Sequence, residues 1–180
     1  MSNGVSSRRA ASALLVCVLL LAAAASAGTP RPQIVGCLDR AAVWAGVHPT
    51  LLRAIAWVES RGNPSAVNRN RNGTYDVGLM QINSWWYTRG LEPWWRHLAV
   101  PCVNAAAGAW VLKQCVAISG YTWEAVGCYH AGADWPSSPA RRAAGRAYIA
   151  RVQRAISSAT APQQGTRNAP SPAAADPVRK

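Results

Sequence analysis

The sequence lacks the residues from which several kinds of site are built. Among its 180 residues there is no phenylalanine, and only three histidines and seven acidic residues are present. No two cysteines form a C-x-x-C pair, and His48, His97 and His130 are scattered, so we expect no metal site and no cofactor. With three glutamates and four aspartates, candidates for acid–base chemistry are few.

The longest apolar run is too short to span a membrane. Residues 10–25 carry no charge, but a spanning helix needs roughly 20 apolar residues. The run follows Arg8 and Arg9 and ends at a small-x-small cleavage site, residues 25–27. We therefore predict a signal peptide over residues 1–27, cleaved after Ala27. The mature protein is then periplasmic or secreted, and meets the membrane only through this signal.

A strong positive charge remains after the predicted cleavage. Removal of Arg8 and Arg9 leaves 17 of the 19 basic residues and all seven acidic ones, a net charge of +10. Such a surface binds polyanions. Because an exported protein seldom meets nucleic acid, we expect no nucleic-acid partner and favour the anionic bacterial envelope.

The mature chain divides into a lead, a body and a tail. Residues 28–36 form a short lead, and residues 37–157 are expected to fold as one compact, mostly helical domain. Residues 158–180 are rich in Ala, Pro and Ser, with basic residues near the end. We expect this tail to be disordered, because it cannot bury enough apolar surface to fold.

Apolar spacing and turn signals predict helices around one small hairpin. The predicted helices cover residues 37–47, 49–61, 103–118, 122–129 and 139–156. Asn72-Gly73 is a strong tight-turn signal, so we predict a β-hairpin within residues 66–83. Together these elements indicate an α+β domain that is mostly helical.

Glu59 is the carboxyl group best suited to donate a proton. It lies four residues after Ile55 and seven after Leu52, so it continues an apolar helix stripe. Burial there disfavours the ionised form and raises the pKa above the ordinary value of about 4.3, as a general acid near neutral pH requires. The alternative is a helix-end glutamate that faces solvent or pairs with Arg61.

Among the other carboxyl groups, only Asp76 is a further candidate. Glu92 precedes a proline in a predicted loop, and Glu124 lies in a first helical turn, where the helix dipole favours negative charge. Asp76 follows the predicted turn closely. Its alternative role is to hydrogen-bond backbone N–H groups of the hairpin.

Three ordered motifs resemble those of the soluble lytic transglycosylase (SLT) family of the lysozyme-like superfamily. They are residues 56–64 (AWVESRGNP), 76–84 (DVGLMQINS) and 121–132 (YTWEAVGCYHAG). The resemblance covers roughly residues 37–132, and three motifs in order are a specific signal. Within the family, the chain most resembles the small IagB-like enzymes attached to secretion systems and pili.

The resemblance implies a lysozyme-like fold and cleavage of the β-1,4 bond between N-acetylmuramic acid and N-acetylglucosamine in peptidoglycan. Glu59 would protonate the glycosidic oxygen, and the acetamido group of the substrate would stabilise C1. Glu59 would then act as base while the C6 hydroxyl closes a 1,6-anhydro ring. One carboxyl group suffices for this route.

The resemblance also implies a set of substrate-binding residues, namely Ser60, Gly78, Met80, Gln81, Asn83 and Tyr129. His130 stands where the family usually has asparagine. Either side chain can hydrogen-bond a sugar, and the alternative is a neutral helix-end histidine. Among the tryptophans after the hairpin, Trp86 is our first candidate for stacking on a sugar, the alternative being that they pack the core in place of phenylalanine.

Four cysteines remain after the signal peptide, at Cys37, Cys102, Cys115 and Cys128. An even number in an exported chain predicts two disulfides, with three possible connectivities. The IagB-like resemblance suggests that Cys37 pairs with Cys102, which leaves Cys115 to pair with Cys128.

Three functions follow, in decreasing order of support. The first is a monomeric lytic transglycosylase that opens the wall locally during assembly of a secretion system or pilus, whose components are its possible partners. The second is a hydrolytic muramidase that uses both Glu59 and Asp76, because the segment from Glu59 to Asp76 also resembles animal c-type lysozyme. The third is a non-catalytic peptidoglycan-binding assembly factor, supported by the positive charge.

Overall fold

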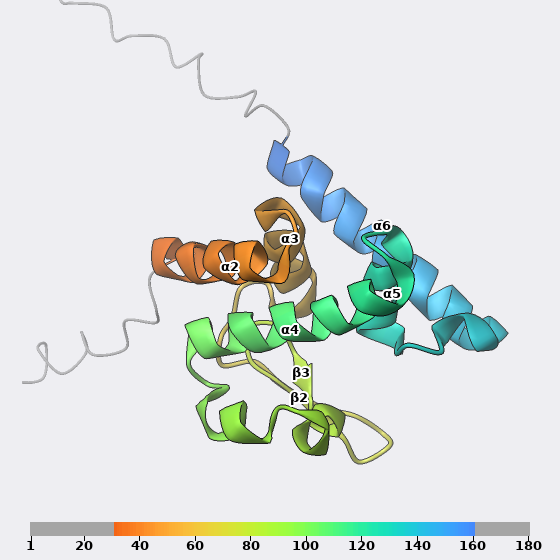
Figure 1. The fold of residues 1–180 in the computed structure, drawn as a ribbon, viewed down its shortest axis with the longest axis horizontal. Helices are drawn as coiled ribbons and strands as arrows, with labels where there is room; N and C mark the ends of the chain where they lie inside the picture. The colour runs from red at the N-terminus through yellow and green to blue at the C-terminus, as the bar shows by residue number, and fades with distance from the viewer. Residues whose placement is uncertain (1–30, 161–180) are drawn as a thin grey trace, which may run out of the picture.

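The computed structural model describes residues 31–160, which form helices around one small sheet (Figure 1). The α-helices of this part are α2 (Arg31–Ala45), α3 (Pro49–Ser60), α4 (Pro101–Ser119), α5 (Trp123–Ala131) and α6 (Pro139–Thr160). The strands are β1 (Val67–Arg69), β2 (Tyr75–Val77) and β3 (Ile82–Asn83). Three short 3-10 helices complete it: η1 (Ser84–Arg89), η2 (Glu92–His97) and η3 (Trp135–Ser137).

Local signals at both ends define α3, the helix that carries Glu59. At its start, His48 accepts a hydrogen bond from the Thr50 backbone N–H at 3.2 Å, and Pro49 occupies the first turn. At its end, Arg61 adopts a left-handed conformation with φ 57°. The buried side of α3 includes Leu52 and Ile55, which anchor the helix in the core.

Helix α4 lies at the centre of the helical layer and packs against α2 and α5 (Figure 1). It is long and apolar enough to cross a membrane by length and composition, but many of its apolar residues, Leu112 among them, are buried in this core. Gly108 is needed for the packing, because a Cβ there would lie 2.7 Å from side-chain atoms of Met80. Small residues on α4 therefore allow close approach of the segment after β2.

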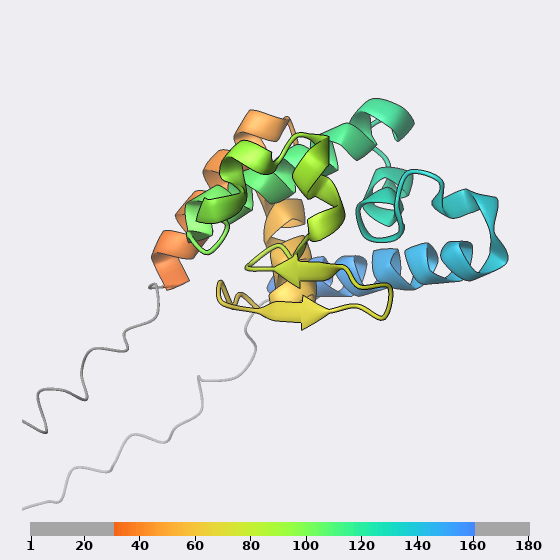
Figure 2. The same ribbon diagram turned by 90° about the horizontal axis from the view of Figure 1, so that it is seen from below.

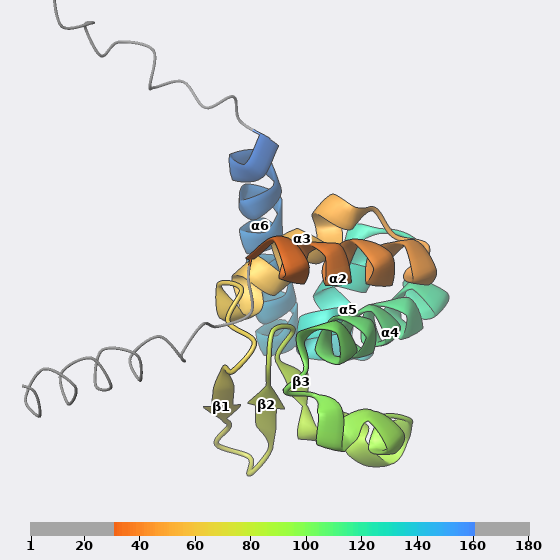
Figure 3. The same cartoon turned by 90° about the vertical axis from the view of Figure 1, so that its left-hand side faces the viewer.

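The three strands form an antiparallel sheet in the order β1-β2-β3, which projects from one side of the helices (Figures 2 and 3). The register places Asn68 opposite Asp76 and Asp76 opposite Asn83. This confirms the mostly helical α+β class with a small β-structure between helices, and adds a third strand to the predicted hairpin. The sheet thereby aligns three polar side chains across its strands.

Two predicted helix bounds were wrong. Helix α2 begins at Arg31, within the predicted lead, because Ile34 extends its buried face. Helix α6 continues to Thr160, within the predicted tail, where the hydroxyls of Ser157, Ser158 and Thr160 donate to carbonyl oxygens four residues earlier. The predicted signal peptide and residues 161–180 lie outside the described part.

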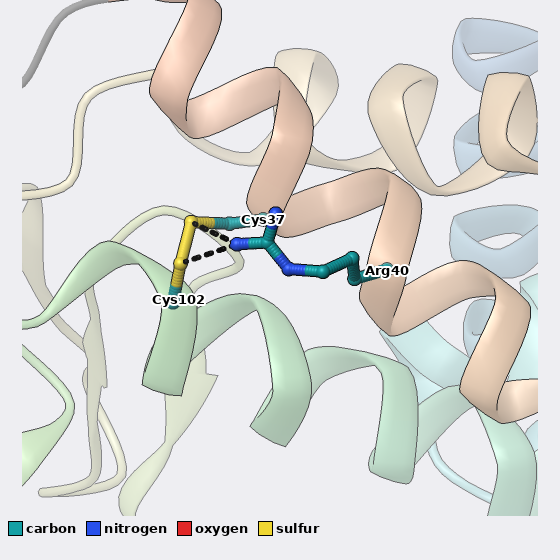
Figure 4. The surroundings of a disulfide bond; sticks show 3 residues. All are labelled: Cys37, Arg40 and Cys102. Atoms are coloured by element: carbon teal, nitrogen blue, oxygen red, sulfur yellow. Dashed lines mark hydrogen bonds between the residues drawn. A yellow bond between two sulfur atoms is a disulfide. The ribbon is translucent and has the colours of Figure 1, made fainter.

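Two disulfides connect the helices. Cys37 and Cys102 join α2 to α4, with Cα atoms 4.8 Å apart, and Figure 4 shows the Arg40 guanidinium beside this bond. A guanidinium nitrogen of Arg40 lies 3.5 Å from the Cys102 sulfur. Cys115 and Cys128 join α4 to α5, with Cα atoms 5.7 Å apart. The structure thus contains the pairing that the family resemblance suggested.

Removal of the two disulfides should destabilise the domain unequally. The Cys37–Cys102 bond closes 65 residues and the Cys115–Cys128 bond closes 13. From the entropy of the unfolded chain, C37A/C102A should lower the free energy of unfolding by about 4 kcal/mol and C115A/C128A by about 3 kcal/mol. Denaturant titration of both variants measures this, and a larger loss from the shorter crosslink would contradict the entropic explanation.

Candidate active site

Glu59 is partly buried at the C-terminal end of α3. Its carboxyl group accepts a hydrogen bond of 2.5 Å from the Tyr148 hydroxyl on α6. Burial raises the pKa of Glu59 from 4.5 to about 7; the bond from Tyr148 opposes the rise, the charge of Asp76 adds to it and that of Arg151 opposes it. The group is therefore a carboxylic acid that can release a proton near neutral pH.

Tyr148 is held between two other side chains. The His130 ring stacks on it in parallel, with ring centroids 4.4 Å apart, and the Arg151 guanidinium lies 5.3 Å from its ring centroid. Tyr148 is 1% exposed, and burial together with Glu59 raises its pKa well above the ordinary value. It thus remains a hydrogen-bond donor to Glu59 across the neutral pH range.

A cleft of about 1040 Å³ runs past Glu59 between the sheet and helices α4 and α5. Its lining from the sheet side consists of Asn68, Asn70, Asp76, Gln81, Asn83, Trp85 and Trp86. Its lining from the helical side consists of Gln114, Cys115, Ile118, residues 128–134 and Arg141. Amides, indole rings and a protonated carboxyl group are suited to bind a neutral sugar chain.

Asp76 faces this cleft and is held by side-chain amides. It accepts hydrogen bonds from Asn83 at 2.6 Å, Asn70 at 3.0 Å and Asn68 at 3.3 Å. The sheet register explains two of these contacts, because Asn68 and Asn83 lie opposite Asp76 on the flanking strands. Its partners are therefore asparagine side chains, and its alternative role as a partner of backbone N–H groups was wrong.

Buried Asn104 shapes the segment between β2 and β3, and the sequence analysis did not identify it. Its side chain accepts a hydrogen bond from the Met80 N–H at 2.7 Å and donates to the carbonyl oxygens of Val77 at 2.9 Å and Leu98 at 3.0 Å. Gly78 has φ 78° and is so close to Asn104 that a Cβ there would overlap the amide. A polar residue within the otherwise apolar run of residues 103–112 was the only available signal.

Three of the predicted substrate-binding residues make structural contacts around the segment between β2 and β3. Ser60 donates to the Leu79 carbonyl oxygen at 2.7 Å, which ties α3 to the segment after β2. Met80 is fully buried against Gly108, and Gly78 packs on Asn104. None of Ser60, Gly78 and Met80 is among the residues that line the cleft, so their expected role in holding the sugar stays a prediction.

The remaining predicted residues do line the cleft. Gln81 has φ 49°, and its amide donates to the carbonyl oxygens of Ala66 and Gly78. Tyr129 donates to the Met80 carbonyl oxygen at 2.8 Å, which links α5 to the opposite wall. Asn83 contributes the shortest amide contact to Asp76. Each of these side chains already has a structural partner and also borders the cleft.

Trp86 and His130 each fit both a role in binding sugar and a structural role. Trp86 packs edge-to-face between Trp85 and Trp110 and borders the cleft, whereas Trp85 is half-exposed with Arg89 over its ring. His130 also borders the cleft. Burial, and then the charge of Arg151, lower its pKa, which favours the neutral ring.

A helical domain with a small sheet, a sugar-sized cleft and a protonated glutamic acid in it has the features of a lysozyme-like enzyme. Residues 36–151 match the family described as the transglycosylase SLT domain. The chain belongs to this family, and it is a lytic murein transglycosylase.

Similar proteins of known name support the same assignment. Invasion protein IagB of Salmonella typhimurium (strain SL1344) is 39% identical over 110 residues, which cover 59% of this chain and 68% of the relative. Protein IpgF of Shigella flexneri is 39% identical over 99 residues, covering 53% and 65%. The X polypeptide of Escherichia coli is 40% identical over 105 residues, covering 56% and 61%.

Replacement of Tyr148 by phenylalanine should raise the pKa of Glu59 above about 7. The hydroxyl donates to the carboxyl group and favours its ionised form, so its loss favours the protonated form. A carbon-detected NMR titration of the glutamate carboxyl groups measures the shift. Tyr87→Phe, which changes an exposed tyrosine, is the control. An unchanged or lower pKa in Tyr148→Phe would contradict this role of the bond.

Replacement of Asn104 by alanine should destabilise the domain and disorder the cleft wall. The substitution leaves a buried N–H and two carbonyl oxygens without their partner. We expect a loss of about 3 kcal/mol in the free energy of unfolding. Denaturant titration measures this loss beside Gln153→Ala, which removes an exposed amide on α6. Equal effects of the two substitutions would show that the Asn104 contacts are unimportant.

Proposed function

We propose that Glu59 is both the acid and the base of this transglycosylase. The observation that carries the proposal is its raised pKa of about 7 inside a cleft of sugar-binding character. A protonated carboxyl group next to the scissile bond donates its proton to the leaving glycosidic oxygen between N-acetylmuramic acid and N-acetylglucosamine. The acetamido group of the muramoyl residue then stabilises C1.

The surroundings of Glu59 suit the second half of this reaction. After it has donated its proton, Glu59 is negatively charged, and both the Tyr148 hydrogen bond and the Arg151 charge stabilise that form. The carboxylate can then remove the proton from the muramoyl C6 hydroxyl, whose oxygen attacks C1 and closes the 1,6-anhydro ring. The same group thus alternates between its two protonation states, and a second carboxyl group is unnecessary.

Hydrolysis is the second candidate, and Asp76 is the observation that favours it. Asp76 lines the same cleft as Glu59, so a carboxylate and an acid both face the bound sugar. In a hydrolytic muramidase, Asp76 would stabilise or attack C1, and water would complete the reaction. Its three amide partners hold it firmly in the sheet.

The proposed cellular role follows from where the substrate lies and from a similar protein. Peptidoglycan lies outside the cytoplasm, which agrees with the predicted signal peptide over residues 1–27 and with a periplasmic or secreted enzyme. The relative from Salmonella is named an invasion protein. We propose that this enzyme acts as a monomer and opens the wall locally for a secretion system or a pilus.

Replacement of Glu59 by glutamine should abolish cleavage of purified sacculi, because the amide cannot donate the proton. We expect a loss of about 10²- to 10⁴-fold in turnover with folding retained. Glu124→Gln, at an exposed position on α5, is the matched control and should remain active. Unchanged activity in Glu59→Gln would refute the proposed role of this residue.

The products of the wild-type enzyme distinguish the candidates. Mass spectrometry of the released muropeptides should show 1,6-anhydro ends, and Asp76→Asn should retain them. Reducing ends that disappear in Asp76→Asn would identify a hydrolase. If the protein pellets with sacculi but releases no soluble fragments, the third function, a non-catalytic binding factor, would replace both.

A further inference from the structure

Helix α6 is the most strongly charged element of the described part of the chain. It carries five arginines and no acidic residue, at positions Arg141, Arg142, Arg146, Arg151 and Arg154. Most of the exposed side chains between them are alanine, which does not screen a positive charge. The same helix carries Tyr148, the hydrogen-bond donor to Glu59. The positive charge therefore lies on an element of the active site itself.

Of these arginines, Arg151 is the one next to the reacting group. Its guanidinium lies over the Tyr148 ring at 5.3 Å, and its charge acts on both Glu59 and His130. The side chain is exposed. Within residues 31–160 the ion pairs are Arg53 with Asp39 and Arg141 with Asp134, so Arg151 has no carboxylate partner in this part.

Arg141 is the arginine of α6 that lines the cleft itself. It lies ten residues before Arg151, about 15 Å along the helix axis, and the intervening Ala144 and Tyr148 fall at helical spacing on the same side. Because Arg141 already pairs with Asp134, its charge is partly neutralised. Among the arginines of α6, Arg151 is therefore the cation that lies beside Tyr148 and Glu59 without a carboxylate partner in the described part.

The opposite wall of the cleft has the reverse character. Asp76 lies there within a group of asparagine side chains, and it carries the only ionisable group among the sheet residues that line the cleft. A negatively charged substituent on a bound strand is repelled by Asp76 and attracted by Arg151.

The substrate carries negative charge at one kind of position. The sugar rings of peptidoglycan are neutral, and its carboxylates belong to the peptide that is attached to the lactyl group of each muramic acid. If Glu59 cleaves next to a muramoyl residue, as proposed above, the peptide of that residue begins close to the active site. A guanidinium without a partner is well suited to bind such a carboxylate.

We propose that Arg151 binds a carboxylate of the stem peptide on the muramoyl residue at the cleaved bond. The enzyme therefore prefers glycan strands that carry peptides over strands from which the peptides have been removed. This inference rests on the proposed function, because it places a muramoyl residue beside Glu59. It assigns Arg151 a role in specificity that is separate from proton transfer.

The test compares two substrates in one set of variants. Glycan strands from purified sacculi are used with their peptides intact and after an amidase has removed them, and kcat/KM is measured on both. Arg151→Gln should lower the ratio of kcat/KM on intact strands to kcat/KM on stripped strands by about five-fold. This is the change in equilibrium constant that the loss of one exposed charge pair produces. Any change in the Glu59 pKa affects both substrates alike and cancels in this ratio.

Two further variants complete the design. Arg151→Lys should retain part of the preference, because the positive charge remains. Arg146→Gln removes a positive charge five residues earlier on the same helix. Because position 146 faces about 140° away from position 151 around the helix axis, this substitution should leave the ratio unchanged.

The outcomes separate this inference from the function on which it rests. An unchanged ratio in Arg151→Gln, or an equal fall in Arg146→Gln, would overturn the role of Arg151 while cleavage by the wild-type enzyme persists. Failure of the wild-type enzyme to cleave either substrate would overturn the proposed function and this inference with it.

Discussion

Burial of one carboxyl group at the end of α3 is the constraint on which the site depends. Glu59 is partly shielded from bulk water because its helix packs into the core. Its carboxyl group accepts one strong hydrogen bond from Tyr148 at 2.5 Å. Burial alone would hold the proton too tightly, whereas the Tyr148 bond and the Arg151 charge favour release and bring the pKa to about 7. A group balanced in this way can act as acid and then as base without a large free-energy cost in either direction.

That balance requires segments that are distant in the sequence to stay in place. Asn104 on α4 joins the segment after β2 to the end of η2 through three buried hydrogen bonds. Tyr129 on α5 bonds the carbonyl oxygen of Met80, and the Cys115–Cys128 bond holds α5 against α4. Because Tyr129 and His130 follow directly after Cys128, the disulfide helps to fix two residues that line the cleft together with Glu59. Stability and site geometry therefore depend on the same contacts.

The sequence predicted what is determined by local spacing and missed what depends on distant partners. Glu59 was identified because it continues the stripe of Leu52 and Ile55, and the family motifs supported the choice. Tyr148 was not predicted as a residue of the site, since the carboxyl group that its hydroxyl bonds lies 89 residues away. Asn104 likewise has a partner 27 residues away, in β2. Met80 was expected to touch sugar, but Gly108 opens a space in α4 that takes its side chain into the core. The motif predicted the segment correctly, and packing decided which of its side chains face the cleft.

The presence of two carboxyl groups in the cleft does not by itself imply hydrolysis. Asp76 is surrounded by three asparagine amides in a polar sheet, whereas Glu59 is buried against a tyrosine. The negative charge of Asp76 raises the pKa of Glu59 and so helps to keep the catalytic proton in place. This electrostatic effect and its place in the sheet already account for an aspartate at position 76, with no covalent role at C1. The product is then determined by which nucleophile reaches C1 first, the C6 hydroxyl of the same sugar or a water molecule. That choice depends on how the cleft holds the muramoyl residue rather than on the number of carboxyl groups in it.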